Sequence, residues 1–384
     1  MSATSPLGAV GALAAALLTV LLLQRRFGAP PPARRFAALD GLRGYAAFLV
    51  FIHHAAAWYF LARTGIWTQP PTRLYAHFGQ SSVAIFFMIT GLLFWSKLLD
   101  GRTRPIDWRR LYRSRVLRLA PLFIVFVALL WLAALIASGF RLRVSAARAG
   151  LDTLQWLAFT IVAMPDLNRA PTSLFGGAAW SLPYEWWFYL SLPLGAALVR
   201  ARVATGWLAL GAAGALGGTL WVFARGEWPI AAAFLGGIAC AFVVRMPRVC
   251  AAARRPAMAI VCLAALAAES RFAHPASLAP LLLLSLAFAI IACGNSLFGL
   301  LDWAPARGLG EIGYSIYLLH GIVLFLVFGL ALGREGTLAL SLTGYWAVVY
   351  GCAVAVVVVS FVTFRAIEAP AMASMDRAGA LTAP

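Results

Sequence analysis

The chain has 384 residues, of which 62% are hydrophobic and only 11% are charged, and its formal net charge is +18. This composition excludes an ordinary soluble domain, because too few polar side chains are present to cover a surface in water. All but one of the 31 basic residues are arginines, and they fall mainly in short segments between apolar runs. That pattern is typical of membrane topology and not of a nucleic-acid-binding face.

The first apolar run covers residues 7–23. It is followed by four arginines with three prolines between them, so the positive charges come after the apolar core and not before it, unlike in a signal peptide. We therefore predict an additional N-terminal membrane helix with its N-terminus outside, and residues 1–38 as this helix plus a basic, proline-rich linker. A cytoplasmic or interfacial segment is the alternative, since seventeen residues is short for a span.

The second apolar run, 39–59, carries ionisable residues inside a predicted span. Asp40 and Arg43 stand near its start, and His53 and His54 lie past its middle. In an α-helix, Arg43 and His54 share one face and differ by about 16 Å in depth, whereas His53 is turned about 80° from Arg43. An ionisable group deep in a membrane helix indicates function. The alternative is that His54 only hydrogen-bonds a neighbouring helix and fixes packing.

Further apolar runs predict nine more spans, at 82–96, 119–139, 180–199, 207–224, 230–244, 257–268, 278–301, 312–332 and 338–363. The apolar piece 151–164 is too short to cross a bilayer and suits an interfacial or re-entrant helix. With alternating orientation, 22 of the 31 basic residues fall on the cytoplasmic side, together with a tail at 371–384. The expected architecture is all-α and polytopic, with ten helices in a membrane domain at 39–370 plus the N-terminal one.

Few other polar residues lie inside these spans. Glu185 stands in an aromatic run and is expected at a depth comparable to that of His54, where a carboxylate could orient the imidazole. A structural glutamate bonded to Tyr or Trp is the alternative. Tyr317 and His320 lie on adjacent turns of one helix face, where His320 could also be a packing residue.

Arg115 and Arg118 lie one helical turn apart where the chain re-enters the membrane. Together with Arg43 they could form a cationic rim that binds phosphates, because arginine forks suit phosphate oxygens in partly dry sites. The alternative is ordinary anchoring of the helix by cytoplasmic positive charge. The five cysteines show no CxxC spacing, so we predict no metal site and no disulfide framework.

Several of these runs together resemble the acyltransferase 3 family of integral membrane enzymes. The matching stretches occur in the family's order: LDGLRGYAAFLVFIHH (39–54), SVAIFFMITGLLF (82–94), RSRVLRLAP (113–121), WSLPYEWWFYL (180–190), GEIGYSIYLLH (310–320) and IEAP (367–370). The chain departs from the pattern in its additional N-terminal helix and in Gly313, where the family commonly has a serine. No esterase-like domain follows the last helix, so we expect a stand-alone membrane enzyme.

The resemblance implies transfer of an acyl group, most often acetyl, from acyl-CoA to a hydroxyl of a glycan, a glycolipid or a glycosylated natural product. No permanently bound cofactor is expected. The family's arginine–ten residues–histidine pattern falls on Arg43 and His54, and its basic pair falls on Arg115 and Arg118. The arginines would hold the nucleotide of coenzyme A at the cytoplasmic rim, and His54 would act as general base.

Further roles follow from the same interpretation. Glu185 is predicted to assist His54. The residues predicted to contact substrate are Trp180, Tyr184, Trp186, Tyr317 and His320. The protein is expected in a bacterial inner or plasma membrane, with its C-terminus in the cytoplasm. A transporter or flippase using the same His, Glu and Arg as a proton relay is the main alternative. The lack of an obvious internal repeat argues against a transporter built from two related halves. A non-catalytic membrane scaffold is the third possibility.

Overall fold

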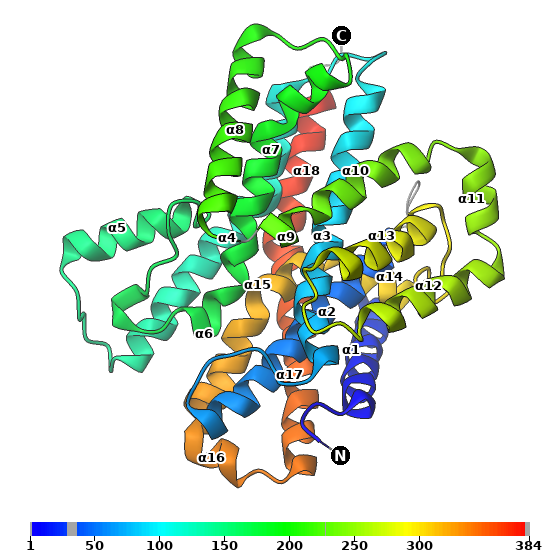
Figure 1. Cartoon of the computed structure of the whole chain (residues 1–384). Coiled ribbons are helices and arrows are strands. Elements are labelled where there is room, and N and C mark those ends of the chain that lie inside the picture. The colour runs from blue at the N-terminus through cyan, green and yellow to red at the C-terminus, as the bar shows by residue number, and fades with distance from the viewer. Residues whose placement is uncertain (1, 29–36, 227, 381–384) are drawn as a thin grey trace.

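A computed structural model describes residues 2–28, 37–226 and 228–380, and over these residues the chain forms helices and no strand (Figure 1). The predicted all-α fold is therefore confirmed. Most of the predicted proline-rich linker and the last four residues of the predicted tail lie outside the described residues. The helix α1 begins at the end of the molecule opposite to that where α18 ends.

The longest helices are α1 (Pro6–Phe27), α2 (Ala37–Thr64), α3 (Arg73–Asp100), α4 (Trp108–Ala137), α8 (Thr205–Ala224) and α17 (Leu342–Thr363). The shorter α-helices are α5 (Ala146–Leu157), α6 (Ser173–Gly176), α7 (Leu182–Leu198), α9 (Trp228–Ala231), α10 (Ala233–Val243), α11 (Pro247–Ala253), α12 (Pro256–Glu269), α13 (Leu278–Ala292), α14 (Ala304–Glu311), α15 (Gly313–Leu324), α16 (Gly333–Ala339) and α18 (Ala369–Ala380). Two 3₁₀ turns, η1 (Leu167–Arg169) and η2 (Gly177–Ser181), and two π-helical turns, η3 (Phe325–Ala331) and η4 (Phe364–Glu368), complete the chain.

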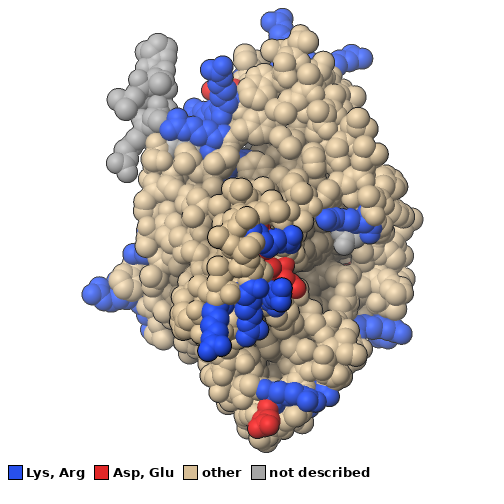
Figure 2. All heavy atoms as spheres, turned by 90° about the vertical axis from the view of Figure 1, so that its left-hand side faces the viewer, with Lys and Arg blue, Asp and Glu red and all other residues tan. Residues whose placement is uncertain are grey.

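Seven helices in the described part of the chain are long and apolar enough to cross a membrane, or eight if the bent pair α10–α11 counts as one. The predicted total of eleven is therefore not confirmed. Helices α7, α12 and α13 do occur at predicted spans but have only 17, 14 and 15 residues. Figure 2 shows one face on which Lys and Arg side chains gather in several groups, one of them beside acidic side chains at its centre, while uncharged residues form most of the surface. The chain is a multi-pass membrane protein.

The N-terminal helix α1 is part of the bundle and packs against α17 and α14. Gly8 and Gly11 let it approach α17 closely, because a Cβ at either position would collide with the ring of Trp346 or Tyr350. The side chain of Gln24 donates a hydrogen bond of 2.9 Å to the backbone carbonyl of Ala304 at the start of α14. The length, hydropathy and packing of α1 agree with the predicted additional membrane helix.

The helix α2 is one uninterrupted helix that contains both Arg43 and His54, and it packs against α3, α14 and α15. Its first turns touch α14 through backbone atoms. A Cβ on Gly310 would lie 1.8 Å from the carbonyl oxygen of Asp40, and a Cβ on Gly44 would lie 2.5 Å from the amide nitrogen of Gly310. These glycines therefore fix the end of α2 that carries Arg43.

The predicted interfacial helix at 151–164 is found earlier in the chain, as α5. Its end is set by the backbone, which turns sharply where Phe159 and Thr160 both adopt positive φ angles. The following segment, 167–181, is largely buried, with Phe175 in contact with the backbone of α15 at Gly321. The start of α7 is therefore buried within the protein and not at a surface.

Candidate active site

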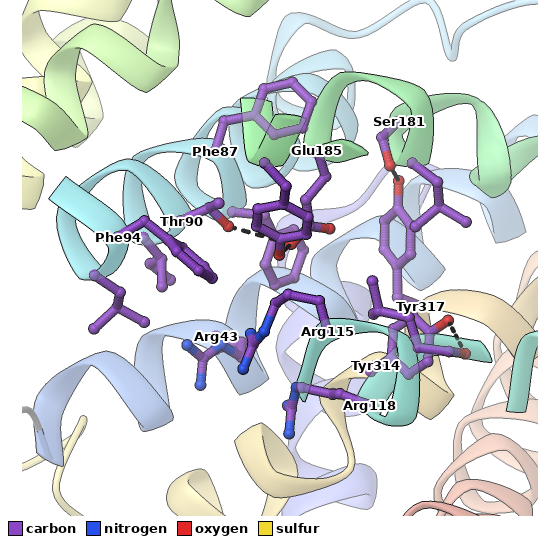
Figure 3. Close-up of a pocket in the computed structure, with 17 residues that line it drawn as sticks. Arg43, Phe87, Thr90, Phe94, Arg115, Arg118, Ser181, Glu185, Tyr314 and Tyr317 are labelled. Carbon is purple, nitrogen blue, oxygen red and sulfur yellow. Dashed lines mark hydrogen bonds between the residues drawn. The ribbon is translucent and has the colours of Figure 1, made fainter. Parts of the chain in front are cut away.

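Three arginines line one cavity of ≈ 310 Å³. Arg43 comes from α2, and Arg115 and Arg118 come from successive turns of α4, so two separate helices bring the cations together (Figure 3). The prediction that these three arginines lie close together is thus confirmed. Their role in phosphate binding stays a prediction.

Each arginine is held by a different partner. A guanidinium nitrogen of Arg43 lies 3.1 Å from a carboxylate oxygen of Asp40, and both side chains remain partly exposed. Arg115 lies 5.2 Å from the centre of the Phe94 ring, and Arg118 lies 3.1 Å from the sulfur of Met372. Because neither the ring nor the thioether carries a charge, the cationic character of Arg115 and Arg118 is not cancelled by these contacts.

Glu185 lines the same arginine cavity and faces the cations across it. Its carboxylate accepts a short hydrogen bond from the hydroxyl of Tyr189, one turn along α7, and a longer one of 3.4 Å from Thr90 on α3. The expected pairing of Glu185 with His54 was wrong. The prediction placed residue 180 at the outer membrane surface, whereas the buried segment before α7 brings Glu185 to the arginines.

A second cavity, of ≈ 250 Å³, contains His54. The Nδ1 atom of His54 lies 3.0 Å from the carbonyl oxygen of Val50, and Nδ1 of His320 lies 2.9 Å from that of Ile316. A carbonyl oxygen only accepts hydrogen bonds, so the network assigns the proton of each neutral ring to Nδ1.

This assignment determines the chemistry of the histidine pair. Nε2 of His320 then carries no proton, and it shares the single Nδ1–H of His54, 3.1 Å away, with the carbonyl oxygen of Val50. The Nε2 atom of His54 is then the nitrogen that can receive a proton, which is what a general base requires. His320 therefore lies beside His54, where sequence analysis had expected Glu185.

His53 lines the same cavity as His54. Its Nδ1 donates a 2.7 Å hydrogen bond to the carbonyl oxygen of Tyr75 on α3, and a Cβ at Gly79 would lie 2.8 Å from that nitrogen. These contacts tie His53 to α3, and no second imidazole of the described chain bonds it as His320 bonds His54.

Comparison with known families decides the class of the protein. A family model described as an acyltransferase domain matches residues 36–365, which is most of the chain. The chain belongs to the acyltransferase 3 family. No curated protein and no solved structure matches it.

In this membrane acyltransferase, the predicted aromatic residues separate. Trp180 lines the histidine cavity, together with the amide side chains of Gln69 and Gln80. Tyr184 instead packs between Phe87 and Trp221, with ring centres 5.5 and 5.0 Å away.

The third aromatic residue, Trp186, packs on Phe159 at a ring distance of 4.9 Å and does not line either cavity. Of the three aromatics expected to contact the acceptor, Trp180 is the one that the structure places beside His54. Trp180 lies in η2, before α7 begins, and within α7 the residues Tyr184 and Trp186 are two apart and so point about 160° away from each other.

Sequence analysis of the acyltransferase missed several residues that line the arginine cavity. Tyr189 and Thr90 bond Glu185, Ser181 bonds Tyr317, and Tyr314 donates to the carbonyl oxygen of Leu119 at 3.0 Å. Spacing alone carried a signal for Tyr189, which follows Glu185 by four residues and so lies on the same helix face. The contacts of Thr90 and Ser181 join separate helices and have no such signal.

Proposed function

We propose that this acyltransferase moves an acyl group, acetyl in chemical class, from acyl-CoA to a hydroxyl group of a carbohydrate. The observation that carries the proposal is the arrangement of two neighbouring cavities, one lined by three arginines and one containing an imidazole with an unprotonated Nε2. The first suits the phosphates of a nucleotide, and the second suits removal of a proton from a hydroxyl.

The donor would bind with its nucleotide at Arg43, Arg115 and Arg118. Several phosphate charges cannot enter the hydrocarbon region of a membrane without cations, whereas the pantetheine arm is thin and uncharged. Because His54 lies eleven residues beyond Arg43 on the continuous helix α2, the arm would have to extend by about 16 Å along that helix.

The acceptor would bind beside His54. Trp180 offers an aromatic face, and Gln69 and Gln80 offer amide groups, a combination that can pack against a sugar ring and bond its hydroxyls. A glycan, a glycolipid or a glycosylated natural product would satisfy this chemistry. By the arginine distribution, the donor would come from the cytoplasm and a glycan acceptor from the opposite face of an inner or plasma membrane.

The test is release of coenzyme A by purified protein in detergent or nanodiscs. Acetyl-CoA and a panel of mono- and oligosaccharide acceptors would be supplied, with free thiol and acylated product both measured. We expect acceptor-dependent release that His54→Ala abolishes. Equal release by wild type and His54→Ala, or none with any donor and acceptor, would contradict the proposal.

A further inference from the structure

The arginine cavity and the histidine cavity share a wall. Tyr317 lines both of them. Ser181 lines the arginine cavity, and the preceding residue, Trp180, lines the histidine cavity. If the donor binds on one side and the base lies on the other, the carbonyl carbon of the acyl group has to lie at this wall, because its bond to sulfur is exchanged there for a bond to the acceptor oxygen.

The wall is closed by a hydrogen bond of 2.7 Å between the hydroxyl groups of Tyr317 and Ser181 (Figure 3). Both side chains are buried, each only 7% exposed. The Ser181 hydroxyl also lies 3.5 Å from the carbonyl oxygen of Ala178, which can only accept. If Ser181 donates to that carbonyl, Tyr317 donates to Ser181, so two adjacent hydroxyl groups at the wall each carry an O–H donor.

Tyr317 of α15 packs against α3. Its ring meets Phe86 edge-on, with ring centres 5.6 Å apart and an interplanar angle of 71°. One turn further along α15 stands His320, which bonds His54. The same helix therefore carries the hydroxyl at the wall and the imidazole that orients the proposed base.

We propose that the hydroxyl groups of Tyr317 and Ser181 exchange their mutual hydrogen bond for the carbonyl oxygen of the acyl thioester and stabilise the oxyanion that forms there. This inference rests on the proposed function. Preorganised donors in a site without bulk water stabilise a developing negative charge strongly, because little reorganisation is needed when the charge appears.

The chemical step balances with the groups that the proposal names. The acceptor oxygen bonds to the thioester carbonyl carbon while its proton passes to Nε2 of His54. The carbonyl π electrons move to the oxygen, which accepts hydrogen bonds from Tyr317 and Ser181. The C=O bond then re-forms and the C–S bond breaks. The coenzyme A sulfur leaves with the bonding electrons and takes the proton back from His54.

The experiment compares Tyr317→Phe and Ser181→Ala with wild type. Tyr317→Phe keeps the ring against Phe86 and removes only the hydroxyl. We expect kcat to fall about 10²- to 10³-fold, the usual effect of deleting one oxyanion donor, while the apparent constant for acyl-CoA changes less than about threefold. Tyr345→Phe is the matched control: Tyr345 is buried on α17 outside both cavities, and its variant should keep wild-type kcat.

A purely structural role for the Tyr317–Ser181 pair, as a barrier between the two cavities, predicts a different result. If the pair only separates the cavities, Tyr317→Phe would keep kcat with acceptor and raise acceptor-free hydrolysis of acyl-CoA, and that outcome would overturn the inference. Ser181→Ala supplies a second test if Tyr317→Phe does not fold. If wild type and Tyr317→Phe are equally active while His54→Ala is inactive, the oxyanion role fails and the proposed function stands. If wild type transfers no acyl group, both fail.

Discussion

Nε2 of His320 accepts a hydrogen bond from Nδ1 of His54 at 3.1 Å, joining α15 to α2. His320 is itself oriented by the carbonyl oxygen of Ile316. This arrangement fixes the ring of His54 and leaves its Nε2 without a proton. In many hydrolases a carboxylate accepts the Nδ1–H hydrogen bond and orients the catalytic imidazole. Here the imidazole of His320 takes that position.

His320 is expected to act as a positioning residue. His320→Leu removes one of the two acceptors for Nδ1–H of His54 and leaves only the carbonyl oxygen of Val50, and we expect kcat to fall about 10- to 100-fold. His320→Gln offers an amide oxygen as an alternative acceptor and should recover a large part of that loss. Steady-state kinetics of the two variants checks this. Equal loss in both would indicate that His320 only fills space.

His54 is expected to be the base itself. His54→Ala should lower kcat by about 10²- to 10⁴-fold, because the attacking hydroxyl would lose its proton acceptor. His53→Ala should have a milder effect, since His53 bonds the carbonyl oxygen of Tyr75 on α3. Acyl transfer is measured at matched amounts of inserted, folded protein. Equal loss in the two variants would reject the assignment of His54.

Arg115 and Arg118 are expected to determine donor affinity. Arg115→Ala or Arg118→Ala should raise the apparent constant for acyl-CoA about 10- to 100-fold, since losing a hydrogen bond to a charged group costs about 1.5–3 kcal/mol. The apparent constant for the acceptor should change less. Arg113→Ala is the control, because Arg113 lies on the same helix but is exposed and outside the cavity. An unchanged apparent constant for acyl-CoA would indicate that both arginines only anchor the helix at the membrane surface.

The sidedness of the protein can be tested with an impermeant thiol reagent in intact cells. Ser173→Cys and Ser374→Cys, each in a background without the native cysteines, place probes at two exposed positions. The arginine distribution predicts labelling at position 173 and none at 374. Labelling at 374 alone would invert the topology and put the arginine cavity on the wrong face for a cytoplasmic donor.

Gly310 is expected to be sterically irreplaceable. Gly310→Ala would place Cβ 1.8 Å from the carbonyl oxygen of Asp40, a backbone atom that cannot move without displacing α2. Overpacking of this kind typically costs about 1–3 kcal/mol. Gly351→Ala is the control, because a Cβ there meets no atom within 4 Å and helix propensity favours alanine. Thermal unfolding in detergent should show a lower midpoint for Gly310→Ala than for Gly351→Ala.

The sequence alone predicted the class of the protein and the geometry within each helix. A chain this apolar has to fold in lipid, where backbone groups are satisfied inside helices. Helical periodicity then relates residues on one element, which is why Arg43 and His54 were placed on one face of α2, and Arg115 beside Arg118. The six motif stretches indicated the acyltransferase family because they occur together and in order.

The tertiary structure decided which helices meet. Counting residues from a presumed membrane surface placed Glu185 near His54, but the buried segment 167–181 carries the start of α7 into the bundle and brings Glu185 to the arginines. His320 takes the place beside His54, and Ser181 meets Tyr317. Periodicity within one helix carries no information on the depth at which another helix begins, so contacts between helices depend on packing of the whole bundle.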